Sequence, residues 1–502
     1  MTIEKRKKIR MIFITILLVF VFVIVISEIL LRIFWNGLMP PPEKEAPFPF
    51  IENQYDDVNY TLRPDIHYRY IGKNINKLGF RFPDSITKEK KPGTYRVVVL
   101  GDSVVFGLRT SEEDTISAVL EDRLNSIDLS GGRRAEVINF GGPGYNMTQY
   151  CAVLKRYAKQ YNPDLIIIGI TFYNDLDGYT NKYIGNGYIS PVPVSDVNGY
   201  NYKLDAPSFL VWNSYLLRRI YYLSAPKRDE LVEPYKKHGI PQLWGSCDRK
   251  DDIWDETEEL IDDISMNSAE IGAEVIYAFF PAEQQVRYPE VPETTQKIFS
   301  ELLEKRNIKY IDFTKDFQDY YRISGHRPFR DSDSHPDNTM FDHISSSIRD
   351  EVLFNSNHSI RDNFNGVINI GHEDDKNYLS FGWGRRWKYN KRFRWVIGVH
   401  ARLIFPEFKK EINSLSIGAK SFDGCKGQIL SVSVNGREIE DIKIENFAYF
   451  KKRIIRFKSP LKLERINRID FRVSCAVKQP KPKATTTTPV LYSAAISEVE
   501  LR

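Results

Sequence analysis

Cysteine is scarce in this chain of 502 residues, and its cysteines lie far apart. None of Cys151, Cys247, Cys425 and Cys475 forms a C-x-x-C pair. This spacing argues against a structural zinc site and against a thioredoxin-like redox motif. Cys425 and Cys475 could pair in an oxidising compartment, or they could remain buried free thiols. We therefore expect no metal and no cofactor, and the sequence leaves the disulfide open.

Concentrated charge of one sign and internal repeats are also missing. The chain has 71 Lys and Arg against 66 Asp and Glu, a net charge of +5. Nucleic-acid binding usually needs a concentrated basic face, so we expect no nucleic-acid partner. The chain is too long for one ordinary domain, and its hydrophobic content of 42% allows proper cores. Two folded units and a tail are expected.

Long apolar runs are confined to the amino terminus. A basic cluster, Lys5 to Arg10, precedes the apolar run Met11–Ile26, and apolar residues continue to Trp35. About 20 such residues can span a bilayer as a helix. No small-residue cleavage site and no lipobox cysteine follow, which favours an uncleaved anchor over a signal peptide. The basic flank predicts a single-pass membrane protein over residues 1–35, with a cytoplasmic N-terminus and an extracytoplasmic bulk.

Residues 36–93 read as an extracytoplasmic spacer and lead-in. The run Pro40-Pro41-Pro42 favours a stiff, extended chain that lifts the globular part off the membrane.

Short β-branched runs then alternate with helical patterns, and this alternation predicts βαβ units in a parallel sheet covered on both faces. The expected strands are 95–100, 135–140, 165–170, 274–280 and 309–313, and the expected helices are 116–124, 148–159, 255–266 and 294–305. We place this α/β domain at 94–355. Between about 176 and 252 the pattern dissolves, apart from a helix near 209–222, which suggests an insertion over the active-site edge.

From about residue 365 the pattern becomes all-β. Gln428–Val434 alternates apolar and polar residues and then meets Asn435-Gly436, a dipeptide suited to a type I′ hairpin turn. Residues 468–473 and 490–501 are also strand-like. A β-sandwich over residues 365–502 is the natural interpretation.

The strongest chemical signal is Gly101-Asp102-Ser103, directly after the first strand of the α/β domain. A serine at the carboxyl end of a parallel strand lies where open α/β folds bind ligands. The amide groups of a helix that starts there favour developing negative charge. Two further loops, 139–146 and 172–175, follow other strands and could supply oxyanion donors, so a serine nucleophile is indicated at this edge.

A serine nucleophile needs a base that a third group orients. Of eight histidines, His335 has the best surroundings, because Asp331 and Asp333 precede it by four and two residues. Either carboxylate could hold the ring tautomer. The competing interpretation is a surface histidine in a polar loop. His343 lies on the following amphipathic stretch and is expected to be structural.

Together these blocks resemble the SGNH (GDSL-type) hydrolase superfamily. The resemblance implies a flavodoxin-like three-layer parallel sheet. It also implies that Ser103 is the nucleophile, with an oxyanion hole formed by the amides of Ser103 and Gly144 and by the side chain of Asn174. His335 would be the base and Asp333 its acidic partner.

One spacing differs from the usual pattern. The family's aspartate normally stands three residues before the histidine, where this chain has Ser332. Asp333 gives the spacing found in alginate-type O-acetyltransferases of the same superfamily, and Asp331 is the fallback. The stretch Ile75–Arg81 resembles the lead-in of membrane-anchored, extracytoplasmic members.

The C-terminal block resembles a β-sandwich appended to bacterial surface-glycan enzymes. Trp383, Trp387 and Trp395 could stack on sugar rings if exposed, which would make it a carbohydrate-binding domain, or they could pack in its core.

Three hypotheses follow. The first is an esterase that removes acyl groups, most simply acetyl, from an extracytoplasmic glycan. The second is an O-acetyltransferase acting on a cell-surface polysaccharide, with a multispanning membrane partner that delivers the acyl donor. The third is an inactive glycan-binding or assembly protein that keeps the fold.

Overall fold

The chain forms two compact units, residues 1–48 with 195–233, and residues 49–194 with 234–502. The computed structural model describes residues 3–34, 50–64, 75–172, 175–176, 179–184, 188–193, 214, 216, 250–288, 291, 293–330, 335–355, 357–360, 364–388, 391–425, 427–444, 450–478 and 491–502. Asn174, Asp331 and Asp333 lie outside these ranges, as do Cys247 and nearly all of the helix expected at 209–222.

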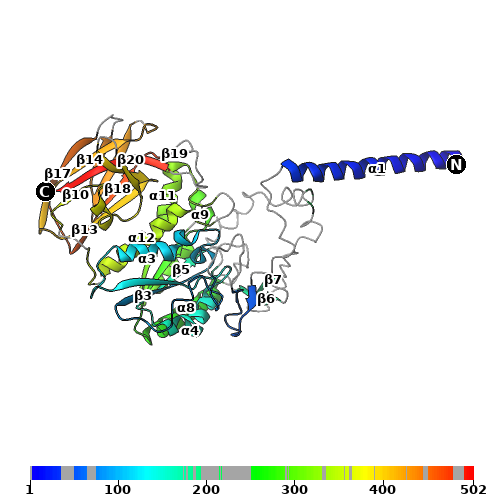
Figure 1. Cartoon of the computed structure of the whole chain (residues 1–502), viewed down its shortest axis with the longest axis horizontal. Coiled ribbons are helices and arrows are strands. Elements are labelled where there is room, and N and C mark those ends of the chain that lie inside the picture. Colours follow the sequence, from blue (N-terminus) through cyan, green and yellow to red (C-terminus); the bar gives the residue numbers. More distant parts are fainter. Residues whose placement is uncertain are drawn as a thin grey trace. The chain divides into compact units, whose positions relative to one another are not determined.

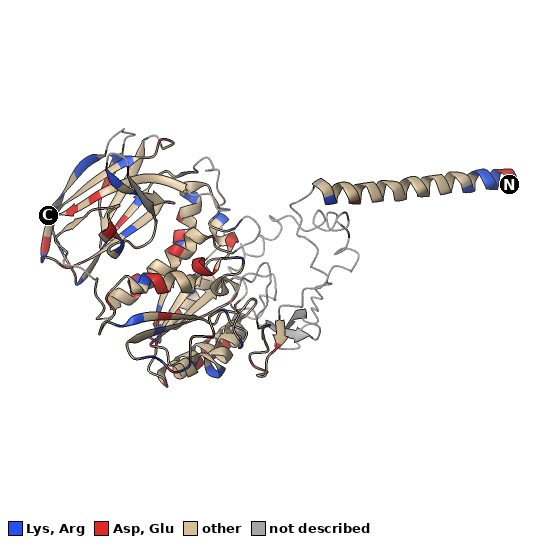
Figure 2. Cartoon of the chain, in the orientation of Figure 1, with Lys and Arg blue, Asp and Glu red and all other residues tan. Residues whose placement is uncertain are grey.

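The first unit contains α1 (Ile3–Phe34), a helix of 32 residues. All of its Lys and Arg residues except Arg32, which lies in the last turn, gather at the N-terminal end (Figure 2). Most of the residues between the two ends are apolar. Among the described residues, this helix alone is long and apolar enough to cross a membrane. The helix expected from the sequence is confirmed, and an anchoring role is possible for it.

The second unit is built around a five-stranded parallel sheet (Figure 1). Its strands are β3 (Thr94–Leu100), β4 (Arg134–Asn139), β5 (Leu165–Thr171), β8 (Glu274–Phe280) and β9 (Lys309–Asp312). The order is β4-β3-β5-β8-β9, and every neighbouring pair is parallel. Counted along the chain this is the order 2-1-3-4-5 of flavodoxin-like sheets. The predicted strands and fold class are confirmed.

Helices cover both faces of this sheet, because alternate side chains of each strand point to opposite sides. Val97 and Val99 pack on the side of α3 (Ile116–Asn125) and α12 (Asn338–Asn355). Val98 and Leu100 pack on the opposite side. The helices there are α4 (Met147–Arg156), α8 (Lys250–Ala269) and α10 (Thr294–Glu304). The described residues also form α2 (Ser103–Phe106), α9 (Glu283–Arg287) and α11 (Thr314–Ser324), with 3-10 turns at Glu112–Asp114, Ala158–Tyr161 and Glu373–Asn377.

Two small antiparallel pairs stand outside the main sheet. In the lead-in, β1 (Phe50–Glu52) pairs with β2 (Tyr60–Leu62). In the insertion, β6 (Tyr179–Ile184) pairs with β7 (Tyr188–Pro193). The sequence showed no pattern at 179–193, so this hairpin was missed.

The C-terminal part consists of two antiparallel sheets that share one core, as the sandwich interpretation predicted. One sheet holds β10 (Val367–Ile368), β11 (Trp383–Lys388), β12 (Arg392–Ile397), β14 (Glu411–Ser421), β17 (Lys451–Lys462), β19 (Val477–Lys478) and β20 (Leu491–Leu501). The other holds β13 (His400–Pro406), β15 (Gln428–Val434), β16 (Arg437–Ile444) and β18 (Ile466–Val473). The turn Asn435-Gly436 has φ of 51° and 80°, as a type I′ turn requires.

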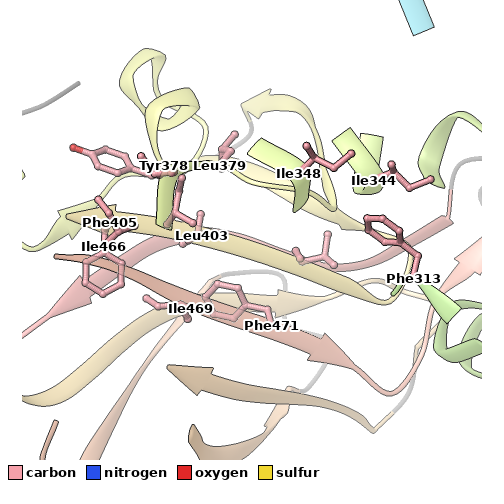
Figure 3. Close-up of a cluster of buried hydrophobic side chains, with 14 of the residues drawn as sticks. Phe313, Ile344, Ile348, Tyr378, Leu379, Leu403, Phe405, Ile466, Ile469 and Phe471 are labelled. Carbon is pink, nitrogen blue, oxygen red and sulfur yellow. The ribbon is translucent and has the colours of Figure 1, made fainter. Parts of the chain in front are cut away.

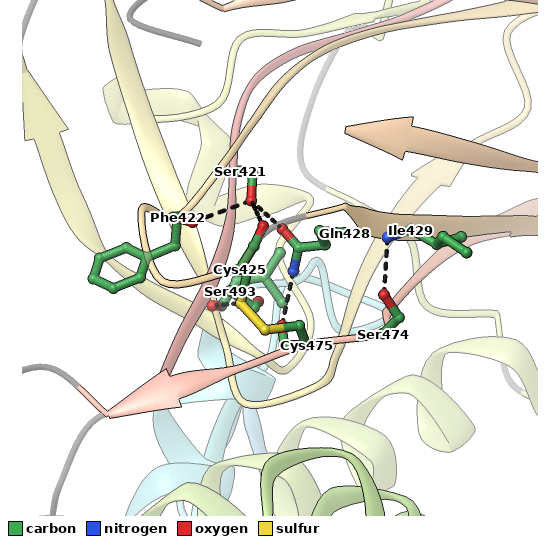
Figure 4. Close-up of a disulfide and its surroundings, with 9 residues drawn as sticks. Ser421, Phe422, Cys425, Gln428, Ile429, Ser474, Cys475 and Ser493 are labelled. Atoms are coloured by element: carbon green, nitrogen blue, oxygen red, sulfur yellow. Dashed lines mark hydrogen bonds between the residues drawn. A yellow bond between two sulfur atoms is a disulfide. The ribbon is translucent and has the colours of Figure 1, made fainter. Parts of the chain in front are cut away.

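A disulfide joins Cys425 to Cys475 at one end of the sandwich (Figure 4). The Ser421 hydroxyl donates to the carbonyl of Cys425 at 2.9 Å, and the Gln428 side chain donates to that of Cys475 at 2.7 Å. Both cysteine backbones are therefore fixed by neighbouring side chains.

The sandwich and the α/β layers share a hydrophobic core. Ile344 and Ile348 of α12 lie in one cluster with Leu403 of β13 and Phe471 of β18 (Figure 3). Below 2% of each of these side chains is exposed. The sandwich is therefore packed onto the helical layer as part of the same unit.

The tryptophans of the sandwich take part in packing. Trp383 is half-buried, its ring edge meets Phe471, and its Nε1 donates to the carbonyl of Arg402 at 2.7 Å. Trp395 is half-buried against Phe393, Phe422 and Tyr492. The side chain of Trp387 lies outside the described part.

Candidate active site

Ser103 stands at the turn between β3 and α2. Gly101 directly follows the strand, and a Cβ there would lie 2.3 Å from the Val105 side chain, so only glycine fits. Asp102 caps α2 by accepting the Val104 amide at 2.8 Å, and Gly107, with φ of 76°, ends the helix in the left-handed conformation. The local sequence thus presents Ser103 as the first residue of a tight helical turn at the carboxyl edge of the sheet.

His335 reaches the same point from the other end of the domain. Its carbonyl accepts the Arg330 amide at 2.9 Å, and Asp337 caps α12 by accepting the Met340 amide at 3.0 Å. This short loop places Nε2 of His335 2.8 Å from Oγ of Ser103. The structure therefore brings together two residues that are 232 positions apart in the chain.

The glycine-rich loop after β4 packs against the nucleophile turn. The Asn139 side chain accepts the Gly141 amide at 2.9 Å and donates to the carbonyl of Val105 at 3.0 Å. The Gly142 amide donates to the carbonyl of Gly101 at 3.0 Å. A Cβ at Gly141 would lie 2.5 Å from the backbone nitrogen of Phe106, so the close approach requires glycine.

Gly144 occupies the third position of a type II turn. The Tyr145 amide donates to the carbonyl of Gly142 at 3.0 Å, Pro143 is the second residue, and Gly144 has φ of 78°. The Tyr60 hydroxyl donates to the carbonyl of Pro143 at 2.9 Å, so the lead-in holds this turn in place. The backbone around the predicted oxyanion residue is thereby fixed beside the nucleophile turn.

Asp175 holds the segment after β5 in place through two hydrogen bonds. Its carboxylate accepts the Thr171 amide at 2.7 Å, and its carbonyl accepts the Met147 amide at 3.3 Å. This ties the end of β5 to the start of α4. The neighbouring Asn174, predicted as an oxyanion donor, lies outside the described residues, and so do the two candidate acids, Asp333 and Asp331.

Asp102 is a buried carboxylate beside the nucleophile. Burial raises its pKa above the usual value, while the Val104 amide and the nearby His335 act in the opposite direction. Its Oδ2 lies 3.5 Å from Oγ of Ser103, at the limit of a hydrogen bond. Its clear task is therefore to cap α2.

Two arginines near the site carried no separate signal in the sequence. Nη1 of Arg81 donates to the carbonyls of Phe106 at 3.0 Å and Gly107 at 2.6 Å. Nη1 of Arg330 donates to the carbonyl of Leu108 at 3.0 Å. Arg81 was predicted only as part of the lead-in stretch, and Arg330 was not predicted. Hydrogen bonds to backbone carbonyls cannot be inferred from the identity of the residues. Within the described part of the chain, no group of three His, Cys, Asp or Glu side chains could hold a metal ion.

Comparison with known proteins found no matching family model and no matching curated protein. Solved structures do match. One is a two-domain esterase active on acetylated mannans, crystallised with mannopentaose, at 10% identity, covering 80% of this chain and 91% of that one, with a TM-score of 0.33. Another is a catalytic mutant of an acetylxylan esterase from Geobacillus stearothermophilus, at 14% identity, 53% and 95% coverage, and a TM-score of 0.29. A third is a lipase/acylhydrolase from Enterococcus faecalis, at 15% identity, 51% and 94% coverage, and a TM-score of 0.27.

All three matched proteins are esterases or acylhydrolases by name. With TM-scores below 0.5, these likenesses carry no argument about what this chain does. The α/β layers have the arrangement that the SGNH resemblance implies. Both the strand order and the place of Ser103 after β3 agree with it.

Proposed function

We propose that this chain is an SGNH-type serine esterase that removes acyl groups, most simply acetyl, from an extracytoplasmic glycan. The observation that carries the proposal is the 2.8 Å contact between Oγ of Ser103 and Nε2 of His335. A hydroxyl within hydrogen-bond reach of an imidazole is the arrangement that activates serine as a nucleophile. The ordered sequence blocks around both residues support the same interpretation.

In the proposed reaction, Oγ of Ser103 attacks the ester carbonyl while His335 takes the hydroxyl proton. The tetrahedral oxyanion is bound by the amides of Ser103 and Gly144 and by the side chain of Asn174. Collapse breaks the ester bond, and His335 gives its proton to the departing sugar oxygen, which leaves as a hydroxyl. Water then attacks the acyl-enzyme, His335 again taking and returning the proton, and carboxylate and free serine result. Asp333 would orient His335, with Asp331 as the alternative.

The proposed extracytoplasmic location is supported by the helix α1 and by the disulfide of the sandwich. The basic N-terminal end of α1 favours a cytoplasmic N-terminus, which places the rest outside. The Cys425–Cys475 disulfide supports this, because disulfides persist in oxidising compartments. Membrane fractions washed with alkaline carbonate should retain the full chain. Release of the chain into the wash would count against the anchor.

Acyl transfer to a polysaccharide is the second candidate. The two-residue spacing from Asp333 to His335 favours it, since alginate-type O-acetyltransferases have that spacing. A multispanning partner would then have to deliver the acyl group. Incubation with an acetylated and a deacetylated glycan separates the two cases. Acetate release without a partner indicates the esterase, and acetylated product formed only with the partner indicates the transferase.

The central test uses the full chain in detergent. We expect it to hydrolyse p-nitrophenyl acetate and to react covalently with a fluorophosphonate probe. Ser103→Ala should abolish the labelling and lower the turnover at least a thousandfold, on the order expected when a triad member is lost.

Ser126→Ala is the matched control. Ser126 is also half-buried, and its hydroxyl donates to the carbonyl of Arg123 at 2.6 Å, away from the site. Its variant should label and turn over like the wild type. Labelling that survives in Ser103→Ala would disprove the assignment of the nucleophile, and a wild-type chain that neither labels nor hydrolyses esters would favour the inactive glycan-binding protein.

A further inference from the structure

The segment that follows the nucleophile helix is strained. Gly107 has φ of 76°, and two residues later Arg109 has φ of 61°. This is the left-handed backbone conformation, which residues other than glycine rarely adopt. Such a conformation persists only where surrounding contacts hold it. The position of Ser103 therefore depends on the contacts that hold residues 106–110 in place.

Two guanidinium groups hold this segment. Nη1 of Arg81 donates to the carbonyls of Phe106 and Gly107, and its Nη2 donates to the carbonyl of Thr110 at 2.8 Å. Nη1 of Arg330 donates to the carbonyl of Leu108 at 3.0 Å, and its Nη2 donates to the Thr110 hydroxyl. Thr110 is thus bound by both arginines, through its carbonyl and its side chain.

Arg330 also holds the segment that carries the base. Its Nε donates to the carbonyl of Pro336 at 3.2 Å, and its Nη2 donates to the Asn338 side chain at 3.2 Å. Its backbone amide donates to the carbonyl of His335 at 2.9 Å. One side chain therefore joins the residues after Ser103 to the residues that flank His335.

We propose that Arg330 is a positioning residue that sets the distance between Ser103 and His335. The proposal rests on the serine-esterase function above. A guanidinium is a rigid, planar group of hydrogen-bond donors. Because Arg330 donates both to the segment after Ser103 and to the segment that flanks His335, it fixes the distance between these two segments. A lysine keeps the charge but offers a flexible point of contact, which can hold one segment and leave the other free to shift.

The expected effect is on turnover rather than on substrate binding. A displacement of about 1 Å between reacting groups can cost on the order of a hundredfold in rate. Arg330 bonds to backbone and side-chain groups that flank the pair, so its loss should weaken the activation of Ser103. We expect Arg330→Lys to lower kcat for p-nitrophenyl acetate by about ten- to a hundredfold. The KM should stay within about threefold.

Arg96→Lys is the matched control. Arg96 is buried at the start of β3, at the opposite edge of the sheet. It also binds backbone carbonyls, those of Tyr161 at 2.7 Å and Lys88 at 3.1 Å, together with the Glu136 carboxylate. Both variants should lower the Tm, but Arg96→Lys should keep the wild-type kcat per folded molecule. A purely structural role for Arg330 would make the two variants alike.

The experiment measures kcat, KM, Tm and the rate of fluorophosphonate labelling for the full-length wild type and both variants in detergent. Arg330→Ala adds a rescue arm, in which millimolar guanidinium should recover part of the lost labelling rate and leave Arg96→Ala unchanged. Equal kcat in Arg330→Lys and the wild type, or equal losses in both lysine variants without rescue, would overturn the inference while leaving the esterase intact. A wild type without labelling or turnover would overturn the esterase proposal and this inference with it.

Discussion

Hydrogen bonds to backbone groups hold the described segments of the candidate site to one another. The nucleophile turn, the glycine-rich loop and the histidine loop come from three places in the chain. The nucleophile turn and the glycine-rich loop meet through the carbonyls of Gly101 and Val105, which accept the Gly142 amide and the Asn139 side chain. The histidine loop meets the nucleophile segment through the contact of His335 with Ser103 and through Arg330. Such contacts leave room for no added atoms, so small steric changes at the loop should act directly on Ser103.

Gly141→Ala tests this close approach. The added Cβ would lie 2.5 Å from the backbone nitrogen of Phe106, so α2 and the loop must move apart. We expect kcat for ester hydrolysis to fall at least tenfold, since misplacement of reacting groups is costly. Thermal unfolding should also occur at a lower temperature, because overpacking typically costs about 1–3 kcal/mol.

Gly131→Ala is the steric control for that variant. Gly131 has φ of 80° but open space around its Cβ position, so alanine there meets only backbone strain. Its Tm should fall while its kcat stays near that of the wild type. Comparable kcat values in the two variants would contradict the steric argument.

At the scale of elements, the disulfide closes the end of the sandwich. Cys425 and Cys475 are separated by 50 positions, and the bridge links the segment between β14 and β15 to the segment after β18. Cross-linking residues this far apart typically contributes about 2–4 kcal/mol by restricting the unfolded chain. The double variant Cys425→Ser/Cys475→Ser should therefore unfold at a lower urea concentration than the oxidised wild type.

Reductant provides the control for this prediction. Dithiothreitol should shift the urea midpoint of the wild type toward that of the double variant and leave the double variant unchanged. If reductant leaves the wild-type midpoint where it is, the bridge contributes nothing to stability.

Some helices and strands could be predicted from the sequence more easily than others. The strands of the parallel sheet are buried on both faces, so continuous apolar runs such as Leu165–Ile170 marked them. β17 is an edge strand, and Lys and Arg occupy most of its exposed positions, which discourages pairing with a further strand. Its residues show no apolar pattern that would have predicted it. The sequence therefore predicted the layer order and missed several edge elements.

The same contrast holds at the site. Ser103 and His335 were predicted because they stand in recognisable blocks, and their 2.8 Å contact now supports the pairing. The contacts of Arg330 run to carbonyls from another part of the chain, and residue identity does not encode those partners. The packing of α12 against the sandwich likewise could not be predicted, because it depends on the fit between two surfaces from different parts of the chain.

At the scale of the second unit, α12 connects the site to the sandwich. The helix begins just after His335, and its inner residues lie in the core shared with both sheets. Arg349 donates to the carbonyl of Leu379 at 3.0 Å, and the Ser380 hydroxyl donates to Asp350 at 2.7 Å. The sandwich should therefore unfold together with the α/β layers rather than as a detachable module.

A row of charged groups lies along this join. Nδ1 of His400 lies 3.6 Å from Asp316 of α11, and its Nε2 lies 2.9 Å from Asp470 of β18. Arg402 approaches Asp470 to 2.7 Å, and His343 approaches Asp316 to 3.3 Å. These partners hold the pKa of Asp316 and that of Asp470 below their usual values, despite the opposing effect of burial.

Lowered pKa values make the join sensitive to acid. An aspartate ionises near pH 3.9 in the unfolded chain, so each carboxylate contributes its stabilisation above that pH and loses it as the pH falls toward the folded-state pKa. We expect the free energy of unfolding, measured in urea, to decline steeply from about pH 5 downward. Because the core is shared, tryptophan fluorescence, to which Trp383 and Trp395 of the sandwich contribute, and circular dichroism from the helices should report one transition.

Asp470→Asn isolates this contribution. The variant removes the carboxylate that Arg402 and His400 share, and each keeps a longer contact, with Asp350 at 3.5 Å and Asp316 at 3.6 Å. This loss should cost about 1–3 kcal/mol at pH 7, and the stability of the variant should vary less between pH 5 and pH 3.5 than that of the wild type. Glu498→Gln is the control, since its ion pair with Lys452 is solvent-exposed and should contribute less than about 1 kcal/mol. Separate transitions for the two probes, or an acid response in Asp470→Asn as steep as in the wild type, would show that the charged row does not hold the sandwich to α11 and α12.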